Sequence, residues 1–112
     1  MKLPPAEAAL VERAKIVDYL LNPAHPDNGG KAVFFLSLGF TAADWEILAN
    51  AFRKMAAEFP VAKSLESRHG RKYVLDGQME SPGGKRAGLR TIWIVDQGRE
   101  IPRLVTAYPH YG

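Results

Sequence analysis

The chain has 112 residues, of which 46% are hydrophobic and 24% are charged, and it contains no cysteine. This length is typical of a single domain, and we expect residues 1–112 to fold as one. The lack of cysteine excludes disulfides, thiolate metal sites and a cysteine nucleophile. No apolar run reaches the ~18 residues of a membrane-spanning helix, so we expect a soluble protein of the cytoplasm.

The net charge of +3 is distributed unevenly along the chain. Residues 1–59 hold six basic and seven acidic side chains, whereas residues 60–112 hold nine basic and five acidic ones. A basic C-terminal half is compatible with a polyanionic partner such as RNA, or with an acidic protein. It is also compatible with an ordinary solvated surface.

The first half of the chain has the apolar period of helices. Residues 15–21 predict a short amphipathic helix that ends before Pro23, with Ile16, Tyr19 and Leu20 on one face. A turn-rich loop follows, because its prolines stop a helix and its glycines supply positive φ. Residues 31–38 predict a second short helix.

A third helix is predicted to end at about Phe59. Thr41 and Asp44 have the spacing of a capping box, which marks the start of this helix. Apolar residues then recur three and four positions apart. The residues expected to pack inward are Trp45, Leu48 and Phe52.

After Pro60 the period changes to two, which is typical of strands. The predicted strands cover residues 61–67, 71–80, 89–96 and 102–108. Residues 89–96 are β-branched and aromatic and predict a central strand, while residues 81–85 predict a hairpin turn. The order predicts an α+β domain, with a helical part over 1–59 and a three- to four-stranded antiparallel sheet over 60–109.

Polar side chains on the last two predicted strands are candidates for chemistry. Thr106 and Tyr108 share one face of the final strand, and Thr91 lies on the strand before it. Because these strands are antiparallel neighbours, we expect Thr91 and Thr106 to come close. Hydroxyls and cations on a rigid sheet are groups that metal-free RNA cleavage uses. Threonine and tyrosine are also ordinary strand residues, so this pattern alone assigns no activity.

The histidines do not have the spacing of metal ligands, so we predict no metal and no cofactor. His25 lies in the turn-rich loop, and His110 lies near the C-terminus. His69 lies in a basic segment that predicts either RNA contacts or merely a charged hairpin turn. The basic residues of this segment are Arg68, Arg71 and Lys72.

Three blocks of sequence extend over nearly the whole chain, from Lys15 to Pro109. The first is Lys15-Ile16-Val17-Asp18-Tyr19-Leu20-Leu21-Asn22-Pro23 with His25-Pro26, Gly30-Lys31-Ala32-x-Phe34-Phe35 and Leu38-Gly39-Phe40. The second is Gly70-x-Lys72-Tyr73 with Gly77 and Pro82-Gly83, and the third is Thr91-Ile92-Trp93 with Pro102-Arg103-Leu104-Val105-Thr106-Ala107-Tyr108-Pro109. Together they resemble a small bacterial domain family of uncharacterised function, whose members occur free-standing and at the C-termini of polymorphic toxins.

Helices followed by an antiparallel meander that ends in a Thr-x-Tyr strand are also similar to the barnase/EndoU/colicin/RelE superfamily of ribonuclease toxins. The resemblance implies a metal-independent endoribonuclease that leaves a 2′,3′-cyclic phosphate and that a small antitoxin or immunity protein controls. It implies His25 as base or acid, and Lys31 or Arg103 as a phosphate clamp. The residues implied to position the scissile phosphate are Thr91, Thr106 and Tyr108.

Several alternatives stay open at the level of sequence. Lys31 is equally a solvated residue of a helical turn, and Arg103 is equally an ion-pair partner of Asp96 or Glu100. The whole chain is alternatively a non-catalytic binding module, such as an antitoxin or regulatory partner, or a structural protein that only oligomerises. The ribonuclease hypothesis predicts that His25, Lys31 and Thr106 converge in one cleft.

Overall fold

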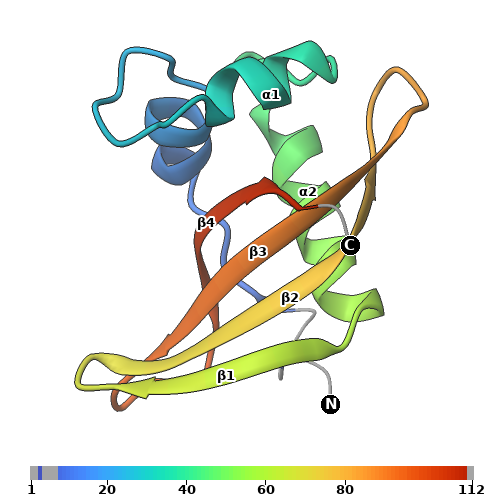
Figure 1. Cartoon of the computed structure of the whole chain (residues 1–112). Helices are drawn as coiled ribbons and strands as arrows, with labels where there is room; N and C mark the ends of the chain where they lie inside the picture. Colours follow the sequence, from blue (N-terminus) through green and yellow to red (C-terminus); the bar gives the residue numbers. More distant parts are fainter. Residues whose placement is uncertain (1–2, 4–7, 111–112) are drawn as a thin grey trace.

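The computed structural model describes Leu3 and residues 8–110 of the chain (Figure 1). Short helices come first and a four-stranded antiparallel sheet follows, which confirms the predicted α+β fold. The helical elements are η2 (Lys15–Leu20), α1 (Lys31–Ser37) and α2 (Trp45–Glu58). The strands are β1 (Val61–Ser67), β2 (Gly70–Glu80), β3 (Arg86–Asp96) and β4 (Arg103–Pro109). Within the described residues, no helix is long and apolar enough to cross a membrane.

The strands lie in the order β1-β2-β3-β4, so each strand pairs with its neighbour along the chain. β3 is an inner strand, as its composition predicts. One outer edge is β1, and the other is β4, where Leu10 forms a parallel bridge to Arg103. This bridge covers the start of the β4 edge with backbone hydrogen bonds.

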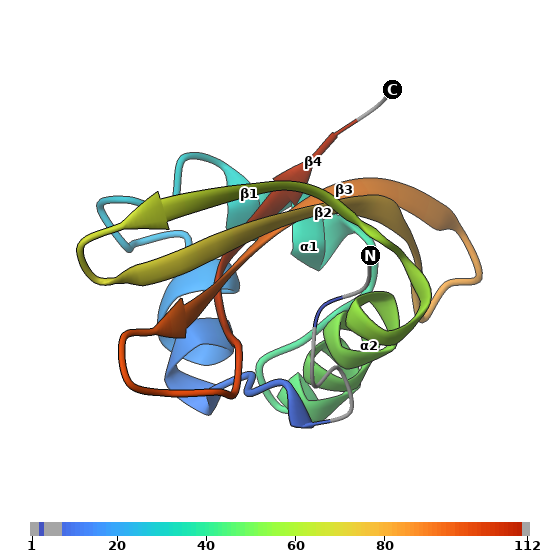
Figure 2. The same cartoon turned by 90° about the horizontal axis from the view of Figure 1, so that it is seen from below.

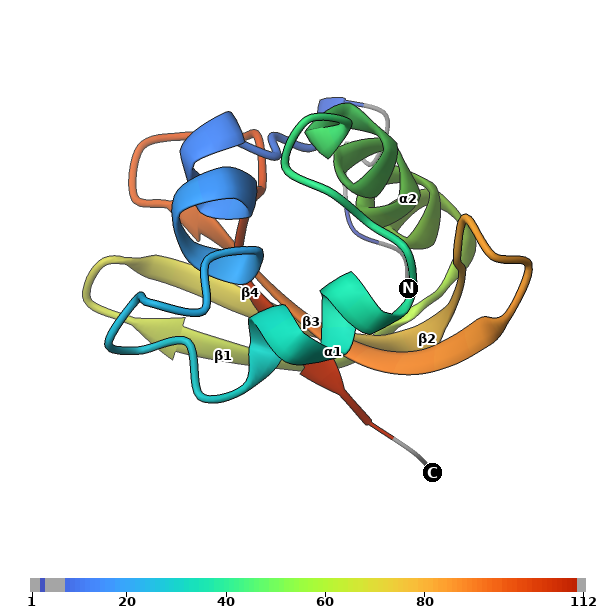
Figure 3. The same cartoon turned by 90° about the horizontal axis from the view of Figure 1, so that it is seen from above.

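The helices gather on one side of the sheet. Figure 2 and Figure 3 show η2 and α2 on the same side of the strands, with α1 beside the far end of β4. We call this side the core face and the opposite side the open face. The end of β4 leads away from the helices, toward the open face (Figure 3).

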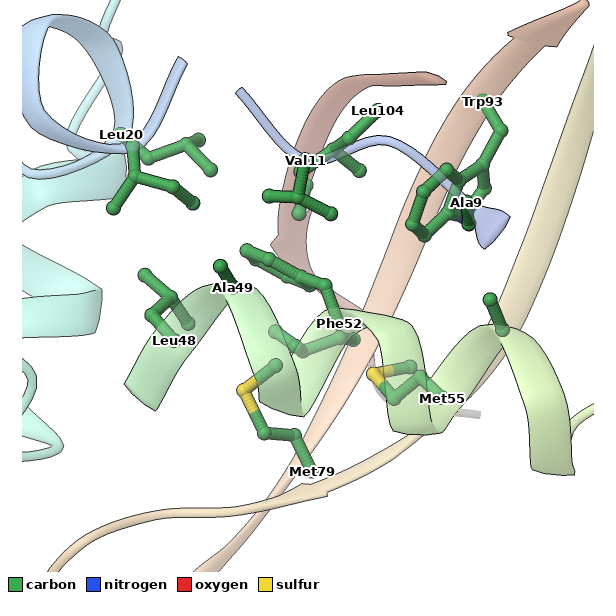
Figure 4. Close-up of a cluster of buried hydrophobic side chains, with 14 of the residues drawn as sticks. Ala9, Val11, Leu20, Leu48, Ala49, Phe52, Met55, Met79, Trp93 and Leu104 are labelled. Carbon is green, nitrogen blue, oxygen red and sulfur yellow. The ribbon is translucent and has the colours of Figure 1, made fainter. Parts of the chain in front are cut away.

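The hydrophobic core lies between α2 and the core face (Figure 4). Phe52 and Met55 of α2 meet Trp93 of β3 and Met79 of β2, and all four are buried. Leu48 is buried as predicted, whereas Trp45 is only half-buried at the margin of the core. Burial of these large side chains supplies the main favourable contribution to folding.

The first helix is wound differently from the α-helix that the sequence predicts. η2 is a π-helix, in which the amide of Leu21 bonds to the carbonyl of Ile16 five residues earlier. Ile16 and Leu20 still share the buried side. The wider turn rotates Tyr19 away from that side and toward β4, where its hydroxyl finds a partner.

The start of α2 also differs from its prediction. The Thr41 hydroxyl accepts a hydrogen bond from the Asp44 amide at 3.2 Å, as in a capping box. However, regular helix begins only at Trp45, and the Asp44 side chain makes no capping bond. The residues between Thr41 and Trp45 form turns that precede the helix.

Candidate active site

A polar cluster surrounds Tyr19, and we call it the Tyr19 cluster. The Tyr19 hydroxyl lies 2.9 Å from Oγ1 of Thr106 on β4. The His25 ring meets the Tyr19 ring edge-on at 5.1 Å between centroids. The ammonium groups of Lys15 and Lys31 lie 5.2 and 5.6 Å from the Tyr19 ring centre, within the range of cation–π attraction. Three residues predicted from the sequence, His25, Lys31 and Thr106, thus all contact one tyrosine.

Asn28 holds the loop that carries this cluster. Its side chain is almost fully buried, donating to the Tyr19 carbonyl at 2.6 Å and accepting from the Ala32 amide at 2.8 Å. The Asn28 carbonyl accepts a bond from the Lys31 ammonium at 3.1 Å. Gly30 then takes a positive φ of 88° directly before α1. The loop is therefore fixed to both flanking helices, so that His25 and Lys31 have defined positions.

The His25 ring has one nitrogen occupied by the backbone. Its Nδ1 accepts a hydrogen bond from the Asp27 amide at 3.0 Å. A proton on Nδ1 would face this N–H, so the tautomer that fits this contact carries its proton on Nε2. In that tautomer His25 presents an N–H donor at Nε2.

A second polar group lies on the open face. Nε and Nη2 of Arg90 donate to the two carboxylate oxygens of Asp76 at 2.7 and 2.8 Å. Nη2 also lies 3.5 Å from Nε2 of His110, and Tyr108 is the cross-strand partner of Arg90. The bond from Arg90 lowers the pKa of Asp76, and the same bond raises the pKa of the Arg90 guanidinium. We call these four residues the Arg90 group.

The open face brings the two groups side by side. Thr106 is the partner of Ile92, and Tyr108 is the partner of Arg90, so both residues of β4 point to the open face. Asp76 of β2 completes the row through Arg90 and Tyr108. The Tyr19 cluster and the Arg90 group are thus two residues apart on one strand.

Thr91 does not join either group. It is fully buried, and its hydroxyl donates to the Leu75 carbonyl at 3.3 Å and accepts from the Trp93 indole at 2.9 Å. Thr91 lies opposite Ala107, so the predicted approach of Thr91 and Thr106 is wrong. The reason is a β-bulge between Ile92 and Trp93, which shifts the register by one residue and turns Thr106 to the other face.

The remaining predicted cations are scattered. Arg103 forms a bidentate pair with Asp96 at 2.7 and 3.0 Å, which confirms the ion-pair alternative. This bond lowers the pKa of Asp96 and raises that of Arg103. Arg71 pairs with Glu66 at 2.6 Å at the end of the β1–β2 hairpin. Arg68 lies exposed in the hairpin turn, and Lys72 lies exposed on the open face.

Two hollows in the surface lie away from the Tyr19 cluster. One of about 350 Å³ lies between α2 and the β2–β3 hairpin, and its lining includes Ile47 and Phe59. Another of about 800 Å³ lies beside Arg103 and Ile101. Across Leu3 and residues 8–110, no group of three histidine or acidic side chains is arranged to hold a metal ion.

Comparison with known proteins places the chain in a family. The model of the family named Domain of unknown function (DUF6883) matches residues 2–111. The chain belongs to this family. No protein with a curated description matches the sequence significantly.

The fold of this DUF6883 domain has a counterpart among solved structures. It is similar to a chain of the contact-dependent growth inhibition toxin–immunity protein complex from Klebsiella pneumoniae 342. The TM-score is 0.73, and the alignment covers 96% of this chain and 97% of the other. The two sequences are 20% identical, so the likeness is one of fold.

Proposed function

We propose that this DUF6883 protein is a metal-independent endoribonuclease toxin, similar to the barnase/EndoU/colicin/RelE superfamily, which a small cognate protein neutralises. The observation that carries the proposal is the gathering of an imidazole, two ammonium groups and the Thr106 hydroxyl around the phenol of Tyr19. The fold shared with a chain of a toxin–immunity complex supports it.

In the proposed reaction the 2′-oxygen of an RNA ribose attacks the adjacent phosphorus, and the bond to the 5′-oxygen breaks. A 2′,3′-cyclic phosphate forms, the 2′-hydroxyl loses its proton to water, and the 5′-oxygen takes one from water. The Lys31 ammonium stabilises the charge of the phosphorane. His25 donates a hydrogen bond from Nε2 to the leaving oxygen, and the Thr106 and Tyr19 hydroxyls hold the phosphate in place.

The first test is cleavage of total bacterial RNA and purified tRNA in the presence of EDTA. We expect discrete fragments with cyclic-phosphate ends. His25→Ala should lower the cleavage rate by roughly 100-fold, the usual cost of losing a donor to developing charge. His69→Ala is the matched control, because His69 is exposed in the β1–β2 turn. Intact RNA at high protein concentration, or equal loss in both variants, contradicts the proposal.

A second function is favoured by the nature of the structural match, because that complex contains an immunity protein as well as a toxin. On this reading the chain is a non-catalytic module that binds a toxin. The two functions predict different outcomes when the protein is expressed alone in bacteria. A toxin is tolerated in bacteria only with its partner or as His25→Ala, whereas a binding module is produced freely as wild type.

A further inference from the structure

We propose that the Arg90 group is a second phosphate-binding site for RNA, adjacent to the Tyr19 cluster. The inference rests on the proposed function, because it takes RNA as the ligand. It assigns a role to Arg90 and His110, neither of which the sequence indicates as a site residue.

Arg90 has hydrogen-bond donors that Asp76 does not use. A guanidinium carries five N–H donors, and Asp76 takes one from Nε and one from Nη2. The Asp76 carboxylate therefore holds the guanidinium in a fixed orientation. Of the three remaining donors, one on Nη2 faces Nε2 of His110 at 3.5 Å, and the two on Nη1 are left for a ligand. Fixed guanidinium donors of this kind suit phosphate oxygens.

Tyr108 and His110 border these donors. Tyr108 lies directly across the strand pair from Arg90, and it also contributes to the raised pKa of the guanidinium. The His110 amide donates to the Gly88 carbonyl at 3.0 Å, which extends the β3–β4 pairing beyond Pro109. This bond fixes the His110 ring near Arg90, with Nε2 3.7 Å from the Asp76 carboxylate. A hydroxyl and an imidazole thus stand beside the guanidinium.

The spacing along β4 separates the two groups by a nucleotide or two. Thr106 and Tyr108 point to the same face two positions apart, which corresponds to ~6.6 Å along a strand. Stacked nucleotides rise by ~3.4 Å each. One phosphate cannot occupy both positions, but an RNA backbone that passes Thr106 would bring a neighbouring phosphate to Tyr108.

The charge of the open face favours a polyanion. The inner strands carry three carboxylates on this face. Asp76 and Asp96 are each paired with an arginine, and Glu80 lies opposite Arg86 at the end of β2. Lys63 of β1 and Lys72 of β2 share this face, and within the described part of the chain neither lies within 4.0 Å of a carboxylate. The open face therefore carries more basic than acidic side chains.

The test measures binding without cleavage. The probe is a short fluorescent single-stranded DNA, which lacks the 2′-hydroxyl that the proposed reaction needs, titrated by anisotropy at several salt concentrations. Arg90→Gln should weaken binding roughly tenfold. The same variant should reduce the slope of log affinity against log salt by about 0.7. Asp76→Asn should strengthen binding by roughly threefold, because it removes a negative charge beside the phosphate while its amide oxygen keeps one acceptor for the Arg90 guanidinium.

Weaker binding by Arg90→Gln together with stronger binding by Asp76→Asn distinguishes a ligand site from a structural ion pair. A structural role alone would weaken binding in both, and that result overturns the proposal. Lys54→Gln removes one positive charge from α2 on the core side and should leave binding unchanged. An Arg90→Gln effect no larger than that of Lys54→Gln also overturns it.

The failure of this site and the failure of the enzyme are distinguishable. Binding that responds to Arg90→Gln without any RNA cleavage retains the phosphate site and contradicts the endoribonuclease. Cleavage of RNA without any effect of Arg90→Gln on probe binding supports the endoribonuclease and contradicts the phosphate site. If the wild type does not bind the probe at all, the phosphate site is wrong and the open face is left for an acidic protein.

Discussion

Tyr19 connects the beginning of the chain to its last strand through one hydroxyl. The bond to Thr106 spans 87 positions of sequence, and the same ring contacts His25 and two lysines. A phenol is suited to this position, because its ring packs while its oxygen reaches a polar partner. A single side chain therefore organises the candidate site.

Removing the Tyr19 hydroxyl should loosen this connection without removing the ring. Tyr19→Phe is expected to lower the free energy of unfolding by about 1 kcal/mol, the usual net contribution of a hydrogen bond. Thr106→Val should cost a similar amount. Because both variants remove the same bond, the double variant should cost less than their sum in urea unfolding. Full additivity would mean that the two hydroxyls do not interact.

Two irregular elements decide where the site residues point. The π-helical turn of η2 directs Tyr19 toward β4, and the bulge between β3 and β4 turns Thr106 toward the open face. A regular α-helix would place Tyr19 closer to the Ile16 side, and a regular ladder in the Trp93–Leu104 register would place Thr106 opposite Thr91. Irregular turns and bulges of these kinds are frequent at functional sites.

A glycine lets the end of α2 meet the sheet. A Cβ placed on Gly77 of β2 would lie 2.6 to 2.8 Å from atoms of the Phe59 ring, which is too close for ordinary contact. Gly77→Ala should therefore destabilise the protein by about 1 to 3 kcal/mol, because the ring must move. The measurement is thermal or urea unfolding.

The matched control for this prediction replaces Phe59, the residue that Gly77 contacts, with a smaller side chain. Phe59→Leu in combination with Gly77→Ala should recover part of the loss, since it makes room for the new methyl group. If Gly77→Ala lowers the stability and the double variant does not recover it, the effect lies in the backbone and the steric explanation is contradicted.

At the scale of the whole molecule, helices cover one side of the sheet, and the other side carries charged residues around Val74, Ile92 and Ile94. The open face holds two ion pairs, Asp76–Arg90 and Asp96–Arg103, which join neighbouring strands. In both pairs the arginine lowers the pKa of the carboxylate below its ordinary value of 3.8. Sheet stability and the charge of the open face are therefore linked.

This linkage predicts how stability changes in acid. A carboxylate with a lowered pKa in the folded state stabilises the protein above its unfolded-state pKa, and this contribution is lost as pH falls through the folded-state value. We expect the wild-type melting temperature to fall below about pH 4. The melting temperature of Asp76→Asn, measured by calorimetry, should fall less steeply over the same pH range. Parallel curves for the two proteins would contradict the linkage.

Much of the fold follows from local patterns of sequence. The switch from helical to alternating period at Pro60 predicts the α+β arrangement, and the β-branched and aromatic run around Trp93 predicts an inner strand. Local patterns suffice here because each strand pairs with its neighbour along the chain. His25, Lys31 and Thr106 are also recognisable as chemical groups before any contact is known.

The full set of residues in the site could be identified only from the tertiary structure. From the sequence, Asn28 is a loop residue, Tyr19 a core residue and His110 part of the C-terminal tail. In the structure Asn28 holds the loop, Tyr19 forms the centre of its cluster, and His110 belongs to the Arg90 group. No periodicity encodes a π-helical turn or the register after a bulge, because both depend on packing between distant segments. The sequence by itself determined the elements and their order. Only the tertiary structure decided which faces they share, because a shift of one residue in a strand reverses the direction of every side chain.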